Sequence, residues 1–176
     1  GHGGSEPGTG DYIMDGLADD VVACLDFLGI SRVHYIGLSI GGMIGQAFAI
    51  KHGHRLVSTM LCATSPQAAP NARDTWQPRM DTVKKANSLA PLGDATMERW
   101  FTESWKPANP SRYKQLHSTI VNTTPGGYLG CAAAILGHDF VAGLPTVKTP
   151  ALVVCGADDA GTPPAGRRGA RTPVTV

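Results

Sequence analysis

The spacing of apolar residues predicts a helix and then a strand near the start of the chain. Between residues 12 and 28, apolar side chains recur every three or four positions, which is the period of an amphipathic helix. Asp11 is placed to cap this helix, and Gly29 is placed to end it in a left-handed conformation. The next segment, 33–36, is β-branched or aromatic, as is typical of a strand.

A turn, a helix and two further strands extend this pattern into a sheet. A tight turn is expected over 37–42, and a helix rich in alanine and glycine over 43–51, whose small side chains allow it to lie close to a sheet. The runs 56–61 and 151–155 are almost entirely apolar, like strands buried on both faces. Strand, helix and strand in this order indicate a right-handed crossover. We therefore expect an α/β fold, with a mostly parallel sheet and helices on both faces.

The pattern changes after residue 64, where helices predominate. We expect a helix near 79–86, a second that Asp94 caps and that runs on to Trp105, and two more that begin at Pro110 and Pro125. The predicted organisation is a core in two parts (1–64 and 146–164), a helical cap (65–145) and an aberrant tail without helical or strand period (165–176). Because both ends lie in loops, we expect the chain to be a fragment.

Composition narrows the classes of function. The net charge is +1 with no long basic run, which argues against nucleic acid as a partner. No apolar run is long enough to cross a membrane. The four cysteines form no C-x-x-C pair and favour reduced, buried thiols in a cytoplasmic protein. No phosphate-binding glycine motif occurs, and the pair His52 and His54 has no third ligand nearby, so neither a nucleotide nor a metal is predicted.

The segment Gly37-Leu38-Ser39-Ile40-Gly41 has the pattern G-x-S-x-G between a predicted strand and a predicted helix. This is the context of a nucleophile elbow, in which the serine hydroxyl projects from a strained turn. We expect the glycines at 37 and 41 to remove side chains that would clash in the bend. The Ile40 N–H, at the start of the helix, is a candidate oxyanion donor. Ser39 is therefore the predicted nucleophile.

A carboxylate and a histidine would have to complete such a site. In this motif's fold the acid follows a later strand, and Asp158 and Asp159 come directly after the run 151–155. All six histidines precede Asp159. Of these, His117 and His138 are expected on the surface or lining the helical segment. Because serine is a weak nucleophile without a base, the chain as written is expected to be nearly inert.

These residues resemble a known family. The segments GLADDVVACLDFLGI and HYIGLSIGGMIGQAFAIKH are similar to α/β-hydrolases of the 3-oxoadipate enol-lactonase group. The similarity continues through ERWFTESW, TPGGYLGCAAAI and LVVCGADDAGTPP, and so covers nearly all of residues 1–164. The resemblance implies that Ser39 is the nucleophile and that Asp159, three residues after Gly156, is the acid in preference to Asp158. It also implies that three strands precede the chain and that a histidine segment follows it.

The implied activity is hydrolysis of a lactone, 3-oxoadipate enol-lactone, in aromatic-compound catabolism, in the cytoplasm and without a cofactor. A dicarboxylate-like product needs cationic contacts, and the cap residues that could supply one are Arg99, Lys106, Arg112 and Lys114. The sequence does not choose among them, and for each of them an ordinary solvated surface charge is the favoured alternative. Two alternatives stay open. One is an α/β-hydrolase of other chemistry, such as a carboxylesterase or a haloperoxidase-like enzyme, and the other is an inactive remnant. The sequence does not indicate the oligomeric state.

Overall fold

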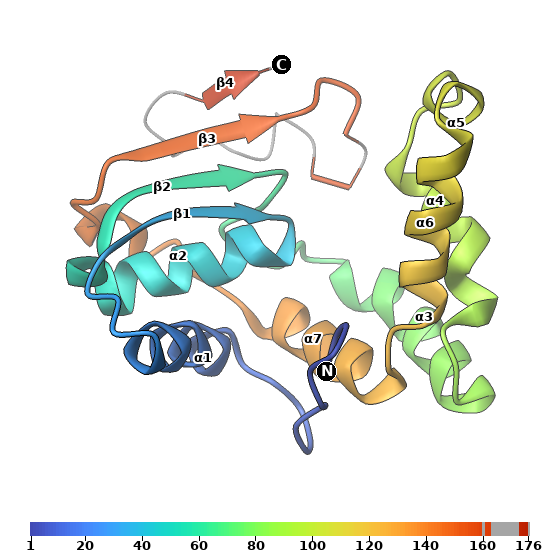
Figure 1. Ribbon diagram of the computed structural model, residues 1–176, viewed down its shortest axis with the longest axis horizontal. Helices are drawn as coiled ribbons and strands as arrows, with labels where there is room; N and C mark the ends of the chain where they lie inside the picture. The colour runs from blue at the N-terminus through green and yellow to red at the C-terminus, as the bar shows by residue number, and fades with distance from the viewer. Residues whose placement is uncertain (160, 163–172, 176) are drawn as a thin grey trace. The chain divides into compact units, whose positions relative to one another are not determined.

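The computed structural model describes residues 1–159, 161–162 and 173–175, which form two compact units (Figure 1). The sheet unit comprises Tyr12–Ala69 and Gly137–Val176, and the helical unit comprises Gly1–Asp11 and Pro70–Leu136. The N-terminal segment therefore belongs with the helices rather than with the strands. No helix in the described part of the chain has the length and apolar character needed to cross a membrane.

The sheet unit is built on four parallel strands in the order β1-β2-β3-β4 (Figure 1). Their bounds are Val33–Leu38 for β1, Leu56–Cys62 for β2, Ala151–Cys155 for β3 and Pro173–Thr175 for β4. The three predicted strands and their parallel arrangement are confirmed. The two central strands are largely apolar, which suits a strand with neighbours on both sides.

Strand β4 corrects the prediction that the tail has no strand. Pro173–Thr175 pairs with β3, with Val153 opposite Pro173. Three residues are too few to show an alternating pattern, so this strand has no periodic signal in the sequence. The remainder of the predicted tail, 165–172 and 176, lies outside the described residues.

Two helices of the sheet unit, α1 (Met14–Phe27) and α2 (Ile40–His52), lie on the same side of the sheet (Figure 1). Helix α2 packs directly on the strands because its small residues permit close approach: a Cβ on Gly45 would lie 2.6 Å from the Tyr35 ring. The core of this unit is formed by α2 and the strand residues that face it. Its most buried members include Ala47, Phe48, Leu56 and Leu61.

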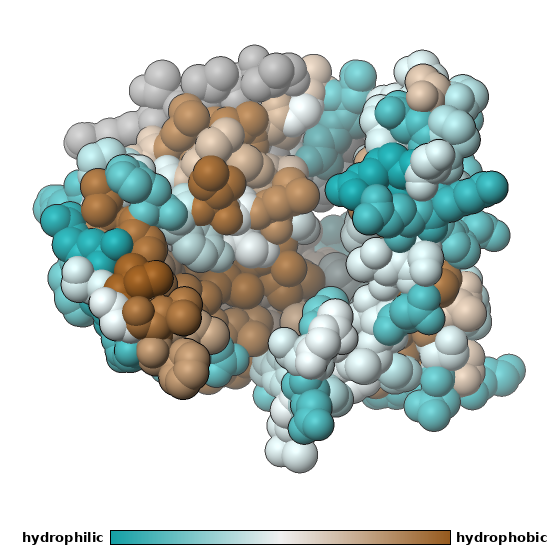
Figure 2. Space-filling model, in the orientation of Figure 1, coloured by the Kyte–Doolittle hydropathy of each residue, from teal (hydrophilic) through white to brown (hydrophobic). Residues whose placement is uncertain are grey.

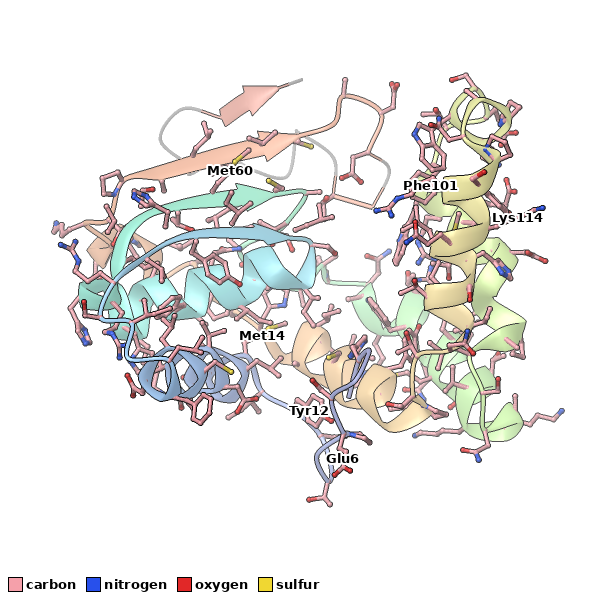
Figure 3. All side chains as sticks on the ribbon, viewed as in Figure 1. Glu6, Tyr12, Met14, Met60, Phe101 and Lys114 are labelled. Carbon is pink, nitrogen blue, oxygen red and sulfur yellow. The ribbon has the colours of Figure 1, made fainter. Side chains whose placement is uncertain are left out.

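The opposite face of this sheet is open in the described residues. Ile36, Leu38 and Leu152 are 72%, 67% and 40% exposed, and Met60 on β2 points away from α2 (Figure 3). Figure 2 shows hydrophobic surface over the strands and over α1. The expectation of helices on both faces is therefore met on one face only within the described sheet unit.

The ends of α1 show where local signals hold and where they fail. Gly29 has the predicted left-handed conformation, with φ of 67°. Asp11 does not cap the helix, because the N-cap is Ile13 and it makes no side-chain cap hydrogen bond. The short 3₁₀ segment Gly53–Arg55 then connects α2 to β2.

The helical unit contains the helices expected after residue 64. They are α3 (Ala72–Ala86), α4 (Gly93–Trp100), α5 (Trp105–Ala108), α6 (Pro110–Val121) and α7 (Pro125–Gly137), with a 3₁₀ segment at Ala90–Leu92. The starts at Pro110 and Pro125 are confirmed. Helix α3 begins earlier than predicted and includes Pro78. Asp94 lies inside the first turn of α4 rather than at its cap, and α4 ends at Trp100 instead of continuing to Trp105.

All four cysteines are free thiols, as predicted. Their burial differs from the prediction: Cys155 is buried, Cys62 and Cys131 are partly exposed, and Cys24 is exposed. Cys24 lies on the outward side of α1, where the apolar run around it suggested a buried position. Burial raises the pKa of the Cys131 thiol.

Candidate active site

Ser39 is the single residue between β1 and α2, and its backbone is strained. Its φ of 53° and ψ of −116° are rare for a residue with a side chain and cost about 1–3 kcal/mol unless the surroundings hold them. The Ser39 N–H donates to the Cys62 carbonyl on β2 at 2.9 Å, and its carbonyl accepts from Gly42 and Met43 at 2.9 and 3.1 Å. The turn is therefore tighter than the predicted loop 37–42.

Crowding around this turn requires glycine at two positions, Gly37 and Gly42. Only the requirement at Gly37 was predicted from the sequence. A Cβ on Gly37 would collide with the backbone of Gly41, and a Cβ on Gly42 would lie 2.6 Å from the Thr64 Cβ. Among the described residues, nothing lies within 4 Å of the position that a Gly41 Cβ would take. The expectation that both motif glycines relieve crowding is thus correct for Gly37 and wrong for Gly41.

The Ile40 N–H is at the first position of α2, where the helix itself supplies no acceptor. No hydrogen bond among the described residues uses this N–H, and the first turn of α2 contains no acidic residue. The Tyr35 hydroxyl donates to the Gly41 carbonyl at 2.7 Å and so fixes the adjacent backbone. A free donor at the positive end of a helix suits an oxygen that gains negative charge. The oxyanion role of Ile40 stays a prediction.

A buried glutamine braces the turn and was missed by the sequence analysis. Gln46 of α2 is 3% exposed, and its Nε2 donates to the Ser65 carbonyl at 2.9 Å, with longer contacts of 3.4 Å to the Thr64 hydroxyl and the Gly42 carbonyl. These bonds tie the segment after β2 to the helix that follows Ser39. A lone amide in an otherwise apolar helix was the available signal, since buried polar groups need partners.

The carboxylate of Asp159 is oriented by its own loop after β3. Its Oδ1 accepts hydrogen bonds from the N–H groups of Gly161 and Thr162, both at 2.9 Å, and its Oδ2 accepts from the Thr162 hydroxyl at 2.8 Å. Asp158 is exposed, whereas Asp159 is partly buried. The fixed orientation supports Asp159 over Asp158 as the acid, an assignment that stays a prediction.

Parallel pairing brings Ser39 and Asp159 to the same edge of the sheet. Ser39 follows β1 and is hydrogen-bonded to the end of β2, whose next residue, Ala63, donates to Val154 of β3 at 2.9 Å. Two strand spacings, about 10 Å, separate β1 from β3. No hydrogen bond in the described part of the chain joins Ser39 to Asp159. Ser39 and Asp159 thus lie at the ends of two strands that are separated by one strand, β2.

No histidine in the described residues is hydrogen-bonded to Ser39. His34 Nδ1 lies 2.8 Å from the Ser58 hydroxyl across β1 and β2. His52 Nε2 lies 2.7 Å from Asp19 and so connects α2 to α1. Both histidines are thus engaged elsewhere in the sheet unit.

The remaining histidines are distributed over both units. His117 of the helical unit lies 3.1 Å from Asp94, and burial lowers the pKa of His2. His54 lies in the 3₁₀ segment after α2. His138 belongs to the sheet unit and is only 5% exposed, so the expectation that it lies on the surface or lines the helical segment is wrong.

Comparison with known proteins gives the same fold. The model of the alpha/beta hydrolase fold family matches residues 1–171. A 3-oxoadipate enol-lactonase of Acinetobacter baylyi is 32% identical over 159 residues, which are 90% of this chain and 58% of that protein. A pimeloyl-[acyl-carrier protein] methyl ester esterase of Chromobacterium violaceum is 31% identical over 93% of this chain and 64% of its own length. The crystal structure of the enol-lactonase from Burkholderia xenovorans superposes with a TM-score of 0.92 at 33% identity, over 99% of this chain and 68% of that one.

The chain belongs to the α/β-hydrolase fold family. Within that family it is similar to enol-lactonases and to a methyl ester esterase, at identities of 31–33%. It spans 58% of the length of the curated lactonase that it matches.

Proposed function

We propose that the protein to which this chain belongs is a serine hydrolase of carboxylic esters and lactones, and that its substrate is 3-oxoadipate enol-lactone. The observation that carries the proposal is the strained turn at Ser39, with a free Ile40 N–H at the start of α2. Backbone strain of this kind is retained where the surroundings over-determine it, commonly at functional sites. The similarity to two enol-lactonases supports the choice of substrate.

The proposed reaction has two steps. The Ser39 hydroxyl attacks the lactone carbonyl carbon and loses its proton to a base, while the carbonyl oxygen becomes negative beside the Ile40 N–H. The ring C–O bond then breaks, and the leaving enol oxygen takes the proton back, so that an acyl-enzyme remains. Water then attacks the carbonyl carbon of this ester and gives one proton to the base. The bond between that carbon and the Ser39 oxygen breaks, and the base passes the proton to the Ser39 oxygen, which releases the free acid. An imidazole between Ser39 and Asp159 would serve as the base, with Asp159 orienting it.

The test is turnover of 3-oxoadipate enol-lactone by the full-length protein and by its Ser39→Ala variant. Loss of the nucleophile is expected to reduce turnover by a factor on the order of 10⁶. Ser58→Ala is the matched control, because Ser58 is the serine that lies beside a histidine in this unit. The proposal fails if Ser58→Ala abolishes turnover and Ser39→Ala does not. The 176-residue chain alone, in which no histidine follows Asp159, is expected to be nearly inert.

A second candidate is a general carboxylesterase. The similarity to a methyl ester esterase at 31% identity favours it. Cleavage of simple aryl esters by the full-length protein, together with no turnover of the enol-lactone, would select this alternative. Both candidates use Ser39, so the same variant separates either of them from an inactive protein.

A further inference from the structure

The structure distinguishes among the cations that were expected to contact a substrate carboxylate. Lys106 is already engaged with the carboxylates of Glu98 and Glu103. Arg112 lies 2.6 Å from the Gln115 side chain on the exposed side of α6. Lys114 points into solvent (Figure 3). None of these three cations faces a cluster of other binding groups.

Arg99 differs because it lies beside a second arginine that the sequence analysis did not single out. Arg79 of α3 stacks over the ring of Trp76, with 5.6 Å between the guanidinium carbon and the ring centre. The Trp76 ring in turn lies 6.1 Å from the ring of Tyr128 on α7. Arg99 of α4 interacts electrostatically with both Arg79 and Tyr128. Three helices of the helical unit thus bring two guanidinium groups and one phenol together.

The electrostatics of this cluster favour an anion. Burial, and then the charge of Arg79, lower the pKa of Arg99, but a guanidinium remains charged at neutral pH. Burial raises the pKa of Tyr128, so its hydroxyl stays protonated and can donate a hydrogen bond. Neither arginine has a carboxylate within salt-bridge distance among the described residues. Two neighbouring positive charges without a counter-ion repel each other, and a bound anion would relieve that repulsion.

The geometry also leaves donors available. The Arg79 guanidinium carbon lies 5.6 Å from the centre of the Trp76 ring, and no hydrogen bond among the described residues uses the Arg79 N–H groups. These donors can therefore still bind a carboxylate. Arg79 and Tyr128 are partly exposed residues. Arg99 is an exposed residue, although its guanidinium group is packed closely enough for burial to lower its pKa. A small ligand can therefore reach all three.

We propose that Arg79, Arg99 and Tyr128 form a carboxylate-binding site in the helical unit. This proposal does not depend on the hydrolase function proposed for Ser39. Its test is therefore a measurement of binding.

The binding test titrates succinate into the 176-residue chain by calorimetry, and follows the arginine Nε resonances by NMR. Saturable binding is expected, and Arg79→Gln and Arg99→Gln should each weaken it about tenfold or more, because each removes charge-assisted hydrogen bonds. Arg73→Gln is the matched control, since Arg73 is an exposed arginine on the same helix as Arg79. It should change the affinity less than about twofold.

Further probes define the ligand and guard against misfolding. Neutral dimethyl succinate should not bind, and inorganic phosphate should bind more weakly than succinate. Tighter binding of phosphate, equal effects of Arg73→Gln and Arg79→Gln, or no saturable succinate binding would each overturn the site. Circular dichroism reports whether each variant folds. If the Arg79→Gln variant unfolds because the contact between residue 79 and Trp76 is lost, the affinities of Arg99→Gln and Arg79→Lys are compared with that of the unmodified protein instead.

Discussion

The two glycines after Ile40 are predicted to respond in opposite ways to the same substitution. Gly41→Ala adds a methyl group where nothing in the described structure lies within 4 Å, whereas Gly42→Ala places it 2.6 Å from the Thr64 Cβ. Both residues lie in the first turn of α2, so the change in helix propensity is similar at both positions. The comparison therefore isolates the packing of the turn against the segment after β2.

The size of each effect follows from the surroundings. Replacing glycine by alanine in a helix is favourable by about 0.5–1 kcal/mol, so Gly41→Ala should stabilise the chain by up to that amount. Gly42→Ala must displace Thr64, which is 4% exposed and lies 3.4 Å from the Gln46 amide. Overpacking of this kind costs about 1–3 kcal/mol. Because the gain in helix propensity is common to both variants, we expect them to differ by the overpacking cost alone, about 1–3 kcal/mol.

Urea denaturation followed by far-ultraviolet circular dichroism measures this difference as a shift in midpoint at constant slope. Gly37→Ala serves as a positive control, because its methyl group would collide with the Gly41 backbone. Equal stabilities for Gly41→Ala and Gly42→Ala would refute the close contact between α2 and Thr64. A stabilised Gly42→Ala variant would refute it more strongly.

Three further predictions concern the sheet unit. The buried hydroxyl of Thr59 finds no partner among the described residues, so Thr59→Val should raise the unfolding free energy by about 1 kcal/mol, whereas Thr64→Val, which loses the contact with the Gln46 amide, should lower it. The hydrogen bond from Lys51 lowers the pKa of Asp19; this stabilisation is present above the unfolded-state pKa and is lost as pH falls through the folded-state pKa. Melting temperatures measured from pH 7 to pH 3 should therefore decline less for Asp19→Asn than for the unmodified chain, and an equal decline would contradict the assignment. The open apolar face should bind the dye ANS, and Ile36→Thr should reduce the fluorescence, because Ile36 is 72% exposed there; unchanged fluorescence would place the dye elsewhere.

Local sequence patterns were sufficient to predict most of the strands and helices. The strands at Val33, Leu56 and Ala151 and the helices that start at Pro110 and Pro125 are apparent because burial imposes a period on the sequence and proline favours a first turn. Helix ends were less predictable. Asp11 and Asp94 have the chemistry of caps but do not act as caps, since the path of the chain around a helix decides which residue precedes it.

The candidate site likewise contains some residues that local patterns predicted and others that they did not. The G-x-S-x-G pattern located Ser39 and Ile40, because a strained turn between a strand and a helix leaves a local trace in the sequence. The buried amide of Gln46 and the crowding at Gly42 depend on the segment after β2, many residues further along the chain. Such requirements could not be read from neighbouring residues alone.

The sequence by itself determined the order and type of the main elements, the nucleophile motif and a carboxylate pair after a later strand. Only the tertiary structure decided which glycine is sterically required, which aspartate is held by its own loop, and that Arg79 lies beside Arg99. The physical reason is the distance along the chain over which each effect acts. Periodicity and turn chemistry act within a few residues. The ring contact of Trp76 with Tyr128 and the electrostatic interaction of Arg79 with Arg99 join helices that are distant in sequence and close only after folding.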